Sequence, residues 1–356
     1  MKTQKAELHL ENGMVFSGFS FGYEQSVSGE IVFNTGMTGY PESLTDPSYK
    51  GEILALTYPL IGNYGVPEFE KERTLQEDFE SDKIHIRALI VSEISEDYSH
   101  WKSVQSLSEW LKREKIPAIS GIDTRTLTQV LRETGTMLGK IIVNNGDVEY
   151  YDPNIVNLVS TVSINKHEVH GEGDKTIALL DCGCKFSIIR NFTDRGFRVL
   201  RLPWDADLKE LEFDALFISN GPGDPEQAKA TIESVRWAME QKIPTMGICL
   251  GHQIMALAAG AKTYKLKYGH RSQNQPVMDL LTKRCYITSQ NHGYAVDDTN
   301  LPKGWKPWFR NLNDNTSEGL IHESGLFKSV QFHPEAEPGP VDTVFIFDRF
   351  IDLISK

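Results

Sequence analysis

Residues 245–253 read Thr-Met-Gly-Ile-Cys-Leu-Gly-His-Gln and contain the pattern Gly-x-Cys-x-Gly around Cys249. The β-rich stretch 214–220 and a helix precede this run, and the apolar, alanine-rich segment 250–261 follows it. Strand, sharp turn and helix with one nucleophilic side chain at the apex make a nucleophile elbow, here with a thiol. Small residues on both sides of Cys249 permit the turn, so we expect the sulfur to stand exposed at the edge of a sheet.

The helix expected after Cys249 directs its free N–H groups and its positive dipole end toward the sulfur, which favours the thiolate. The alternative is a structural cysteine packed beneath a helix, because free cysteines are among the most buried residues. The pentapeptide alone leaves both interpretations open, and the rest of the chain has to decide between them.

Strand-like and helix-like segments alternate before the elbow. Strands are expected at 176–180, 197–202 and 215–219, and helices at 185–195 and 225–241. This alternation predicts an α/β fold with a mostly parallel sheet flanked by helices. Active sites of such sheets lie at the carboxyl ends of the strands, where Cys249 falls. Further strands are expected at 263–268, 276–280, 285–289, 308–311 and 329–332, and a closing helix at about 341–354.

The first 145 residues read as a smaller domain of mixed α and β structure. Strands are expected at 31–34, 53–58 and 86–91, and helices at 103–115 and 124–134, the latter capped by Asp123 and closed by Gly135. Two long loops, 36–50 and 58–66, are typical of segments that shape a site or bind a partner. The polar stretch 146–174 is interpreted as the connection to a C-terminal domain over residues 175–356.

Composition favours a soluble, cytoplasmic protein of two domains. The chain has 356 residues and a net charge of −12, which disfavours binding to nucleic acid or to an anionic membrane surface. No apolar run approaches the roughly 18 residues of a membrane span, and the first residues lack the apolar core of a signal peptide. Four cysteines are too few for a disulfide scaffold and fit a reducing cytosol, in which a reactive thiol survives.

A cysteine nucleophile needs a base, and the run Gln331-Phe332-His333-Pro334-Glu335 offers one. Pro334 favours an extended backbone at His333, so the side chains of His333 and Glu335 point the same way. Glu335 can then fix the imidazole tautomer, while His333 deprotonates Cys249 and protonates the leaving nitrogen. Taken alone, a histidine beside a carboxylate is commonly a surface pair; together with the elbow it predicts a catalytic triad.

A second glycine-rich loop, 220–225, follows the strand at 215–219 and begins a helix. Its glycines let the backbone approach a ligand closely, so the N–H groups of Gly223 and Leu250 are the expected oxyanion donors. An ordinary Gly-Pro turn is the alternative.

Other patterns predict neither a metal site nor a nucleotide site. Cys182 and Cys184 have no second Cys/His pair at ligand spacing. His252, His270 and His292 flank glycines in turn-like contexts and read as structural. No dinucleotide or phosphate-binding fingerprint occurs.

Three motifs together resemble the class I, or triad, glutamine amidotransferases: Gly-Ile-Cys-Leu-Gly-His-Gln at 247–253, Asn-Gly-Pro-Gly-Asp-Pro at 220–225 and Gln-Phe-His-Pro-Glu at 331–335. They occur in the order typical of that family, and the similarity covers about 176–356. Further runs resemble the small, glutamine-hydrolysing chains of carbamoyl-phosphate synthase, nearly from end to end. These runs lie at 34–40, 44–49, 57–65, 121–125, 127–128, 269–270, 274, 276–277 and 289–294.

The resemblance implies a function and a set of site residues. Cys249, His333 and Glu335 would be the catalytic triad that hydrolyses L-glutamine to glutamate and ammonia. The glutamine pocket would be lined by Ser48, Gly221, Gly223, Leu250, Gln253, Asn291, Gly293 and Tyr294, with Ser48 supplied by the N-terminal domain. A large partner subunit would bind ATP and Mg²⁺ and use the ammonia to make carbamoyl phosphate for arginine and pyrimidine synthesis, whereas this chain would hold no cofactor.

The chain departs from the family pattern at a few positions. Cys182 and Cys184 replace a non-cysteine pair, and Arg271-Ser272-Gln273 and Gln275 replace smaller or histidine residues; none belongs to the triad. The rival functions are an amidotransferase that serves another synthase, a non-catalytic docking subunit and a cysteine peptidase. The N-terminal runs between 31 and 65 argue against the first, the intact triad against the second and the pocket motifs against the third.

Overall fold

The computed structural model describes residues 4–70 and 75–354, which fold into two compact units divided between Val156 and Asn157. The division falls inside 146–174, the stretch interpreted as the connection. After the division this stretch carries helix α4 (Val159–Val162) and strand β10 (Glu168–His170). Val159 packs into the core of the second unit, whereas Asn154 contacts Glu30 of the first. The polar stretch therefore contributes residues to both units.

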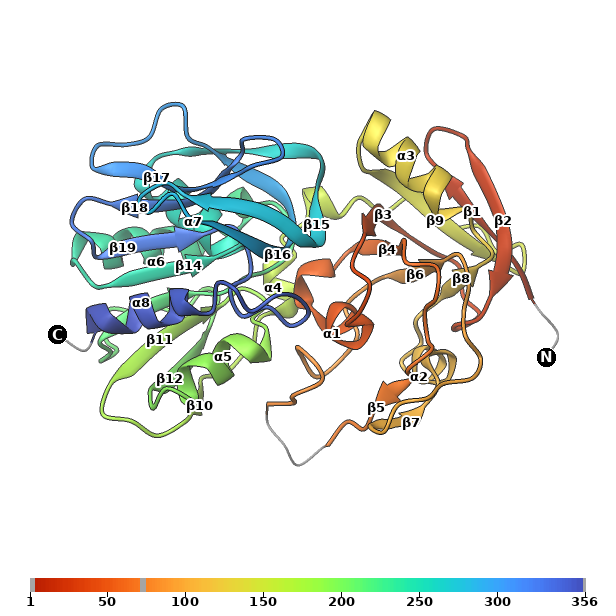
Figure 1. Ribbon diagram of the computed structural model, residues 1–356, viewed down its shortest axis with the longest axis horizontal. Coiled ribbons are helices and arrows are strands. Elements are labelled where there is room, and N and C mark those ends of the chain that lie inside the picture. Colours follow the sequence, from red (N-terminus) through yellow and green to blue (C-terminus); the bar gives the residue numbers. More distant parts are fainter. Residues whose placement is uncertain (1–3, 71–74, 355–356) are drawn as a thin grey trace. The chain divides into compact units, whose positions relative to one another are not determined.

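The first unit is built on a closed barrel (Figure 1). Around the barrel follow β1 (Gln4–Leu10), β2 (Val15–Ser20), β8 (Ala118–Ser120), β6 (Ala88–Val91), β4 (Glu52–Leu56), β3 (Val27–Asn34) and β9 (Met137–Val143), which pairs again with β1. The pairs β3–β4, β4–β6 and β6–β8 are parallel and the other pairs antiparallel. The strands expected at 31–34, 53–58 and 86–91 correspond to β3, β4 and β6.

Helix α2 (Leu107–Arg113) is shorter than the helix expected at 103–115. Ser106 begins it through a capping box with Glu109, whose carboxylate accepts from Ser106 N at 2.9 Å. The preceding residues form β7 (Ser103–Gln105), which pairs with β5 (Val66–Pro67). The side-chain cap sets the start of the helix, although the apolar spacing extends upstream of it.

Helix α3 (Thr124–Thr134) has the bounds expected from the sequence. Asp123 accepts from Thr126 N at 2.9 Å, and Gly135, with φ 107°, ends the helix. The loop expected at 36–50 instead contains helix α1 (Tyr40–Thr45) and the 3-10 turn η1 (Pro47–Tyr49). A proline in the first turn starts both elements, and the loop interpretation overlooked this signal.

The second unit contains a ten-stranded mixed sheet in its described residues. Its order is β10, β12 (Arg198–Pro203), β11 (Thr176–Asp181), β13 (Ala215–Ile218), β14 (Thr245–Ile248), β19 (Phe327–Val330), β18 (Ser317–His322), β17 (Trp305–Asn311), β15 (Lys262–Asp279) and β16 (Cys285–Asp297). The group from β12 to β19 is parallel. β10 joins one side of it antiparallel, and the strands from β18 to β16 continue the other side antiparallel.

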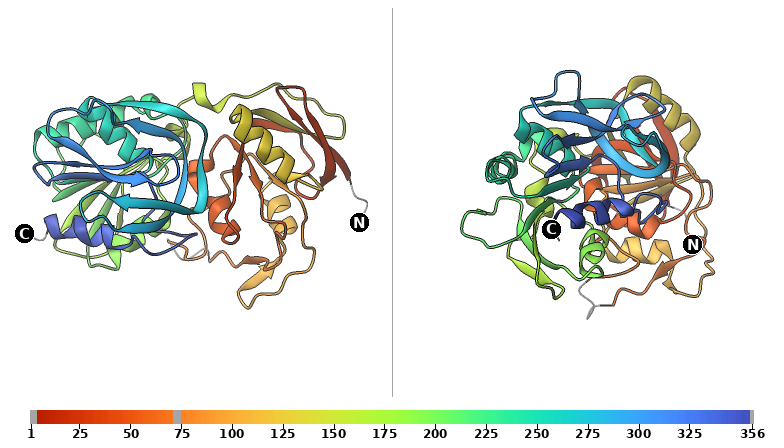
Figure 2. Two further views of the ribbon diagram at one scale, coloured as in Figure 1. Left: turned by 45° about the horizontal axis from the view of Figure 1, so that its top comes forward. Right: turned by 60° about the vertical axis from the view of Figure 1, so that its left-hand side comes forward.

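Helices cover both faces of the parallel strands (Figures 1 and 2). Leu216 and Ile218 of β13 share an apolar core with α6 (Lys229–Glu240) and α7 (Leu250–Ala259). Phe217 points the opposite way. Its ring centroid lies 4.9 Å from that of Phe192 in α5 (Phe186–Thr193) and 5.9 Å from that of Phe350 in α8 (Phe345–Ile354). The period of two along β13 therefore gives each face its own layer of helices, as predicted from the sequence.

Several boundaries differ from those expected. The segments 263–268 and 276–280 belong to one long strand, β15, whose pairing with β16 is interrupted by two register shifts. The helix expected at 225–241 is split into a 3-10 turn, η3 (Pro225–Gln227), and α6. β16 extends through 290–294, and β18 was not expected. His270 and His292 accordingly lie in strands and His252 in α7, not in turns.

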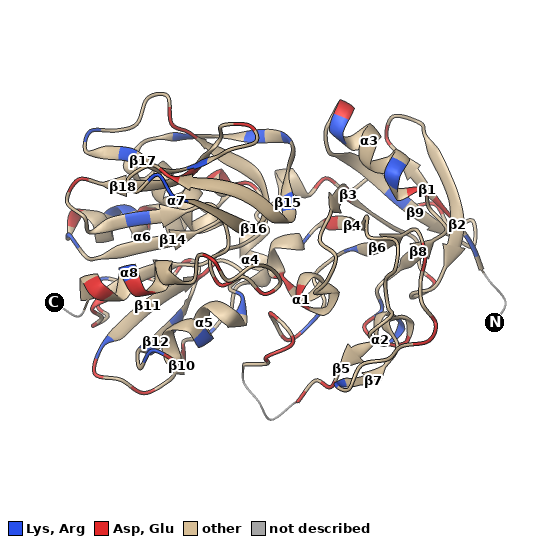
Figure 3. Ribbon diagram, viewed as in Figure 1, with Lys and Arg blue, Asp and Glu red and all other residues tan. Residues whose placement is uncertain are grey.

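None of the described helices combines the length and the apolar composition needed to cross a bilayer. Acidic and basic residues are interspersed along the elements of both units (Figure 3). The net charge of −12 is therefore not confined to one element.

Candidate active site

Cys249 stands between β14 and α7, at the turn expected from the sequence. Its backbone has φ 54° and ψ −106°, and such a conformation costs a non-glycine residue about 1–3 kcal/mol. Two glycines make the turn possible. A Cβ on Gly247 would lie 2.4 Å from the carbonyl oxygen of Gly251, and a Cβ on Gly251 would lie 2.3 Å from that of Ile218. The elbow is thus a strained, closely packed turn that holds the sulfur at the N-terminus of a helix.

The expectation of an exposed sulfur was wrong, because Cys249 is only 2% exposed. The backbone of β16 lies against it: Cys249 Sγ is 3.5 Å from the carbonyl oxygen of Asn291. Antiparallel strands beside the parallel group therefore cover the elbow, a feature that the elbow motif itself does not predict.

We expect Gly251→Ala to destabilise the second unit, although alanine normally favours a helix. Helix propensity would stabilise the variant by about 1 kcal/mol. The added methyl would, however, meet backbone atoms at 2.3 Å, and overpacking costs about 1–3 kcal/mol or more. Thermal unfolding measures the difference, with Gly146→Ala as the control because its added Cβ meets nothing closer than 3.4 Å. An unchanged melting temperature for Gly251→Ala would contradict this account of the turn.

The parallel strands bring the predicted catalytic residues together at their carboxyl ends. Cys249 follows β14, and His333 follows the neighbouring strand β19. His333 N donates to the carbonyl oxygen of Ser289 in β16 at 2.9 Å. His333 Nδ1 lies 2.6 Å from Glu335 Oε1, and both side chains are buried. His333 and Glu335 therefore form a hydrogen-bonded pair beside the elbow.

The charges around His333 favour its protonated form. Burial lowers the pKa of His333, but the Glu335 carboxylate and the Cys249 sulfur outweigh burial and raise this pKa above its ordinary value. Cys249 N donates to the carbonyl oxygen of Val330 at 2.9 Å, which places the elbow beside the end of β19, three residues before His333. His333 Nε2 is engaged by no other described hydrogen-bonding group, so it is the atom available to take the proton of the thiol.

Lys185 completes the site and was not anticipated from the sequence. It lies between β11 and α5, is 2% exposed, and donates from Nζ to Glu335 Oε1 at 3.0 Å and to Ala336 O at 3.1 Å. Burial raises the pKa of Glu335, whereas Lys185 and His333 lower it more, so the carboxylate stays ionised. The available signal was a lysine in an apolar stretch, since lysine is rarely buried without a partner.

We expect Lys185→Met to weaken both the fold and the catalysis. Removing one partner of a buried ion pair costs about 3–5 kcal/mol, because the other charge is left unpaired. Without Lys185 the pKa of Glu335 rises. Because Glu335 must be ionised to hold the imidazolium, activity should then be lost at a higher pH as the solution is acidified. Urea unfolding measures the first effect, and the pH dependence of the glutamine hydrolysis that the family resemblance implies measures the second.

The matched control for this variant is Lys175→Met. Lys175 forms a partly exposed pair with Asp214, and such pairs contribute about 0–1 kcal/mol. If Lys185→Met leaves unchanged the pH below which activity is lost, the positioning role of Lys185 is contradicted.

The loop expected to supply oxyanion donors lies against the elbow. A Cβ on Gly221 would lie 2.1 Å from the carbonyl oxygen of Cys182 and 2.8 Å from a methyl group of Leu250, so only glycine fits there. Gly223 follows with φ 84°. Leu250 is the first residue of α7, and an N–H group at that position has no acceptor within its own helix. The two expected donors therefore come from adjoining segments.

Predicted pocket residues also meet between α7 and β16. Gln253 Nε2 donates to the carbonyl oxygen of Tyr294 at 2.8 Å, and Asn291 contacts the sulfur as described. Gly293 lies between these two carbonyls in β16. β16 thus directs two backbone carbonyls at the helix that begins with the elbow.

Ser48 belongs to the first unit. It is buried in η1, where its N–H donates to Asp46 Oδ1 at 2.9 Å. Its expected place in the glutamine pocket stays a prediction.

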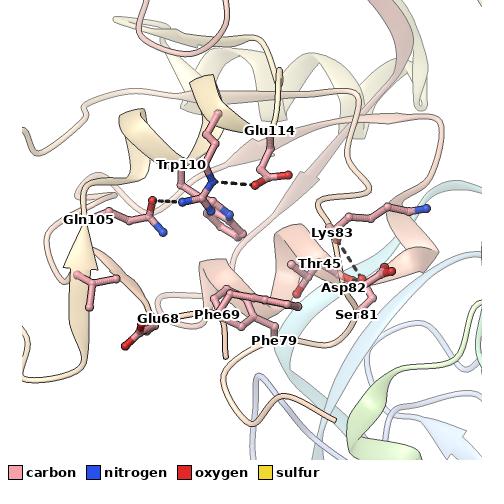
Figure 4. A pocket seen from close by; sticks show the side chains of 12 residues that line it. Thr45, Glu68, Phe69, Phe79, Ser81, Asp82, Lys83, Gln105, Trp110 and Glu114 are labelled. Carbon is pink, nitrogen blue, oxygen red and sulfur yellow. Dashed lines mark hydrogen bonds and ion pairs between the residues drawn. The ribbon is translucent and has the colours of Figure 1, made fainter. Parts of the chain in front are cut away.

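The first unit also contains a separate cavity of about 620 Å³ (Figure 4). Its walls include the aromatic side chains of Phe69, Phe79 and Trp110 and the basic side chains of Lys83 and Arg113. None of the site residues predicted from the sequence is among the described residues that line it.

Two known families match this chain. Residues 8–141 match the carbamoyl-phosphate synthase small chain, CPSase domain, and residues 178–353 match the class-I glutamine amidotransferases. The chain is 50% identical over 366 residues to the arginine-specific small chain of carbamoyl phosphate synthase from Saccharomyces cerevisiae, a match that covers 99% of this chain and 89% of the yeast chain.

Two longer proteins are similarly related. Human mitochondrial carbamoyl-phosphate synthase (ammonia) is 48% identical over 361 residues, and the multifunctional protein CAD of Squalus acanthias is 52% identical over 354 residues. These matches cover 100% and 98% of this chain, which spans 24% and 16% of the respective relatives.

The two family matches confirm the fold class expected from the sequence, an amidotransferase domain preceded by a smaller mixed α/β domain. They occur in the expected order, and the similarity to the yeast protein runs over nearly the full length of both chains. The chain belongs to the family of carbamoyl-phosphate synthase small chains.

Proposed function

We propose that this chain hydrolyses L-glutamine as the glutaminase subunit of a carbamoyl-phosphate synthase. The observation that carries the proposal is the buried trio: Cys249 on the elbow after β14, His333 after the neighbouring strand β19, and Glu335 Oε1 2.6 Å from His333 Nδ1. Family membership alone leaves the nitrogen source open, because the human relative is named for ammonia. A nucleophile with a paired base supports glutamine as the source, since free ammonia needs neither.

In the proposed reaction, Cys249 attacks the side-chain amide carbon of glutamine while His333 Nε2 takes the thiol proton. Glu335 stabilises the imidazolium that forms. The N–H groups of Leu250 and Gly223 stabilise the tetrahedral oxyanion. Collapse breaks the carbon–nitrogen bond, and His333 returns its proton to the departing ammonia. Water then hydrolyses the glutamyl thioester and releases glutamate.

The remaining pocket residues would position the substrate. They are Gly221, Gln253, Asn291, Gly293 and Tyr294, and Ser48 of the N-terminal domain. The close approach of Gly221 to Leu250 and the Gln253–Tyr294 hydrogen bond support a continuous wall beside the elbow.

The ammonia would pass to a large partner subunit. This subunit would bind ATP and Mg²⁺ and combine the ammonia with bicarbonate to make carbamoyl phosphate for arginine and pyrimidine synthesis. The similarity to the yeast arginine-specific chain supports such a partner. This chain would carry out its own reaction without a cofactor, in the reducing cytosol, where its four free cysteines stay reduced. Nucleic acids and membranes are not expected partners.

The test is glutamate release from L-glutamine by the purified chain, alone and with its co-expressed large subunit. Release in either preparation that stops after alkylation of Cys249 by a glutamine-like chloroketone supports the proposal. Release in neither, while the complex makes carbamoyl phosphate from free ammonia, would make the chain a non-catalytic docking subunit.

A further inference from the structure

A second cluster of titratable side chains lies in the antiparallel part of the sheet, outside the triad. His270 of β15 pairs with His292 of β16 across the ladder, and their rings meet edge to face with centroids 4.9 Å apart. Glu318 of β18 completes the cluster, in which one ligand atom from each residue lies within 4.8 Å of the others. All three side chains are buried.

In each imidazole, the ring nitrogen that points away from the cluster contacts a hydrogen-bond acceptor. His270 Nε2 lies 2.8 Å from Asp314 Oδ2, and His292 Nδ1 lies 2.8 Å from the carbonyl oxygen of Tyr294. Because carboxylate and carbonyl oxygens only accept, these outer nitrogens carry the protons of the neutral rings. The inner nitrogens, His270 Nδ1 and His292 Nε2, then present lone pairs to the centre of the cluster.

Gln290 turns a further acceptor toward this centre. Its Nε2 donates to Glu318 Oε2 at 2.9 Å and to Thr288 Oγ1 at 3.2 Å, which fixes the orientation of the amide. Its Oε1 therefore faces the inner nitrogens of His270 and His292, 3.0 Å from each. Glu318 Oε1 lies 3.5 Å from His270 Nδ1. When both rings are neutral, four acceptor atoms thus converge in a buried place, an arrangement that costs free energy unless a metal cation, or a proton on His270 Nδ1, lies between them.

We propose that His270, Gln290, His292 and Glu318 form a binding site for Zn²⁺ or a similar divalent transition-metal ion. Two imidazoles and a carboxylate are ligands that zinc prefers, and the amide oxygen supplies a fourth position. Tetrahedral bonds of about 2.0–2.2 Å place neighbouring ligand atoms about 3.3–3.6 Å apart. The separations of 3.0, 3.0 and 3.5 Å are close to that geometry. Asp314 is the outer carboxylate that commonly orients a metal-bound imidazole.

The proposed ion site adjoins the elbow through β16. The Tyr294 carbonyl that orients His292 also accepts from Gln253, and the neighbouring Asn291 supplies the carbonyl against Cys249. An ion between His270 and His292 would therefore fix the strand that lies over the sulfur. The inference does not depend on glutamine hydrolysis, because ion binding is measured directly.

The experiment uses the full chain carrying Cys249→Ala and Cys285→Ala, which removes the elbow thiol and the exposed thiol as competing ligands. Calorimetric titration with Zn²⁺ alone should show one equivalent bound. Co²⁺ should give tetrahedral d–d absorption without a sulfur-to-metal charge-transfer band. Asp314→Asn should weaken binding about 10–100-fold, and Glu318→Gln at least as much. The half-exposed Asp314 provides a test even if Glu318→Gln fails to fold.

Glu323→Gln is the matched control, because it removes one negative charge from an exposed position close in sequence to Glu318. Its zinc affinity should equal that of the parent. No binding by the parent, or an affinity that Glu318→Gln and Asp314→Asn leave unchanged, would overturn the proposal. A proton would then occupy the centre, and the imidazole ¹⁵N resonances of His270 would show a doubly protonated ring.

Discussion

Cys249→Ala is expected to lower glutamine hydrolysis by roughly 10⁴-fold or more, as the loss of a covalent nucleophile does in other triads. Without the sulfur no thioester forms, and water must attack the amide unaided. Carbamoyl phosphate synthesis from free ammonia by the complex should persist, since that step is assigned to the partner. Glutamate release and ammonia-dependent synthesis, measured on the same preparation, check both halves of this expectation.

Cys285→Ala is the control for this substitution. Cys285 is exposed at the start of β16 and takes no part in the site, so its variant should stay within about twofold of the parent. Glutaminase activity that survives Cys249→Ala, or that falls equally in Cys285→Ala, would remove Cys249 from the mechanism.

His333→Asn is expected to lower kcat for glutamine hydrolysis by about 10²–10⁴-fold, the usual contribution of a general acid–base group. Asparagine accepts no proton from the thiol and returns none to ammonia. The KM for glutamine should change far less, because His333 acts on the reacting atoms and not on the remote part of the substrate. Steady-state kinetics separates the two constants, and the rate of Cys249 alkylation reports the loss of the base independently.

A double variant distinguishes a catalytic unit from independent contributions. Cys249→Ala combined with His333→Asn should be no slower than Cys249→Ala alone, since residues of a triad act together. His167→Asn, at an exposed position of the same unit, should leave kcat unchanged. Multiplicative losses in the double variant would show that the histidine and the cysteine act independently.

The parts of the site that the sequence predicts are those made by neighbours along the chain. The elbow is a local strand–turn–helix signal, and Glu335 reaches His333 because they are two residues apart in an extended segment. Helix α3 was predicted to the residue because Asp123 and Gly135 mark both of its ends. Local chemistry decides each of these features, so a single sequence suffices.

What the sequence did not reveal depends on pairing between distant segments. Lys185 contacts Glu335, which is 150 residues away in the sequence, and no residue close to Lys185 in the sequence indicates this partner. β1 alternates buried and exposed residues, and β8 is three residues long. Neither strand forms a continuous apolar run in the sequence, so the closed barrel could not be predicted from it. Only the family resemblance assigns Ser48 to the glutamine pocket, because no chemistry at its own position in the sequence indicates one.

Residues of the site follow four adjacent strands that are hydrogen-bonded to one another in the parallel part of the sheet. Lys185 follows β11, Gly221 follows β13, Cys249 follows β14 and His333 follows β19. None of these strands is joined by a short turn to its neighbour in the sheet. The position of each strand along its neighbours is therefore set by the hydrogen bonds between the strands and not by the loops that connect them. The reactive geometry is therefore a collective property of these strands. On heating, catalysis should cease in a single step together with cooperative melting of the sheet, instead of fading as individual loops loosen.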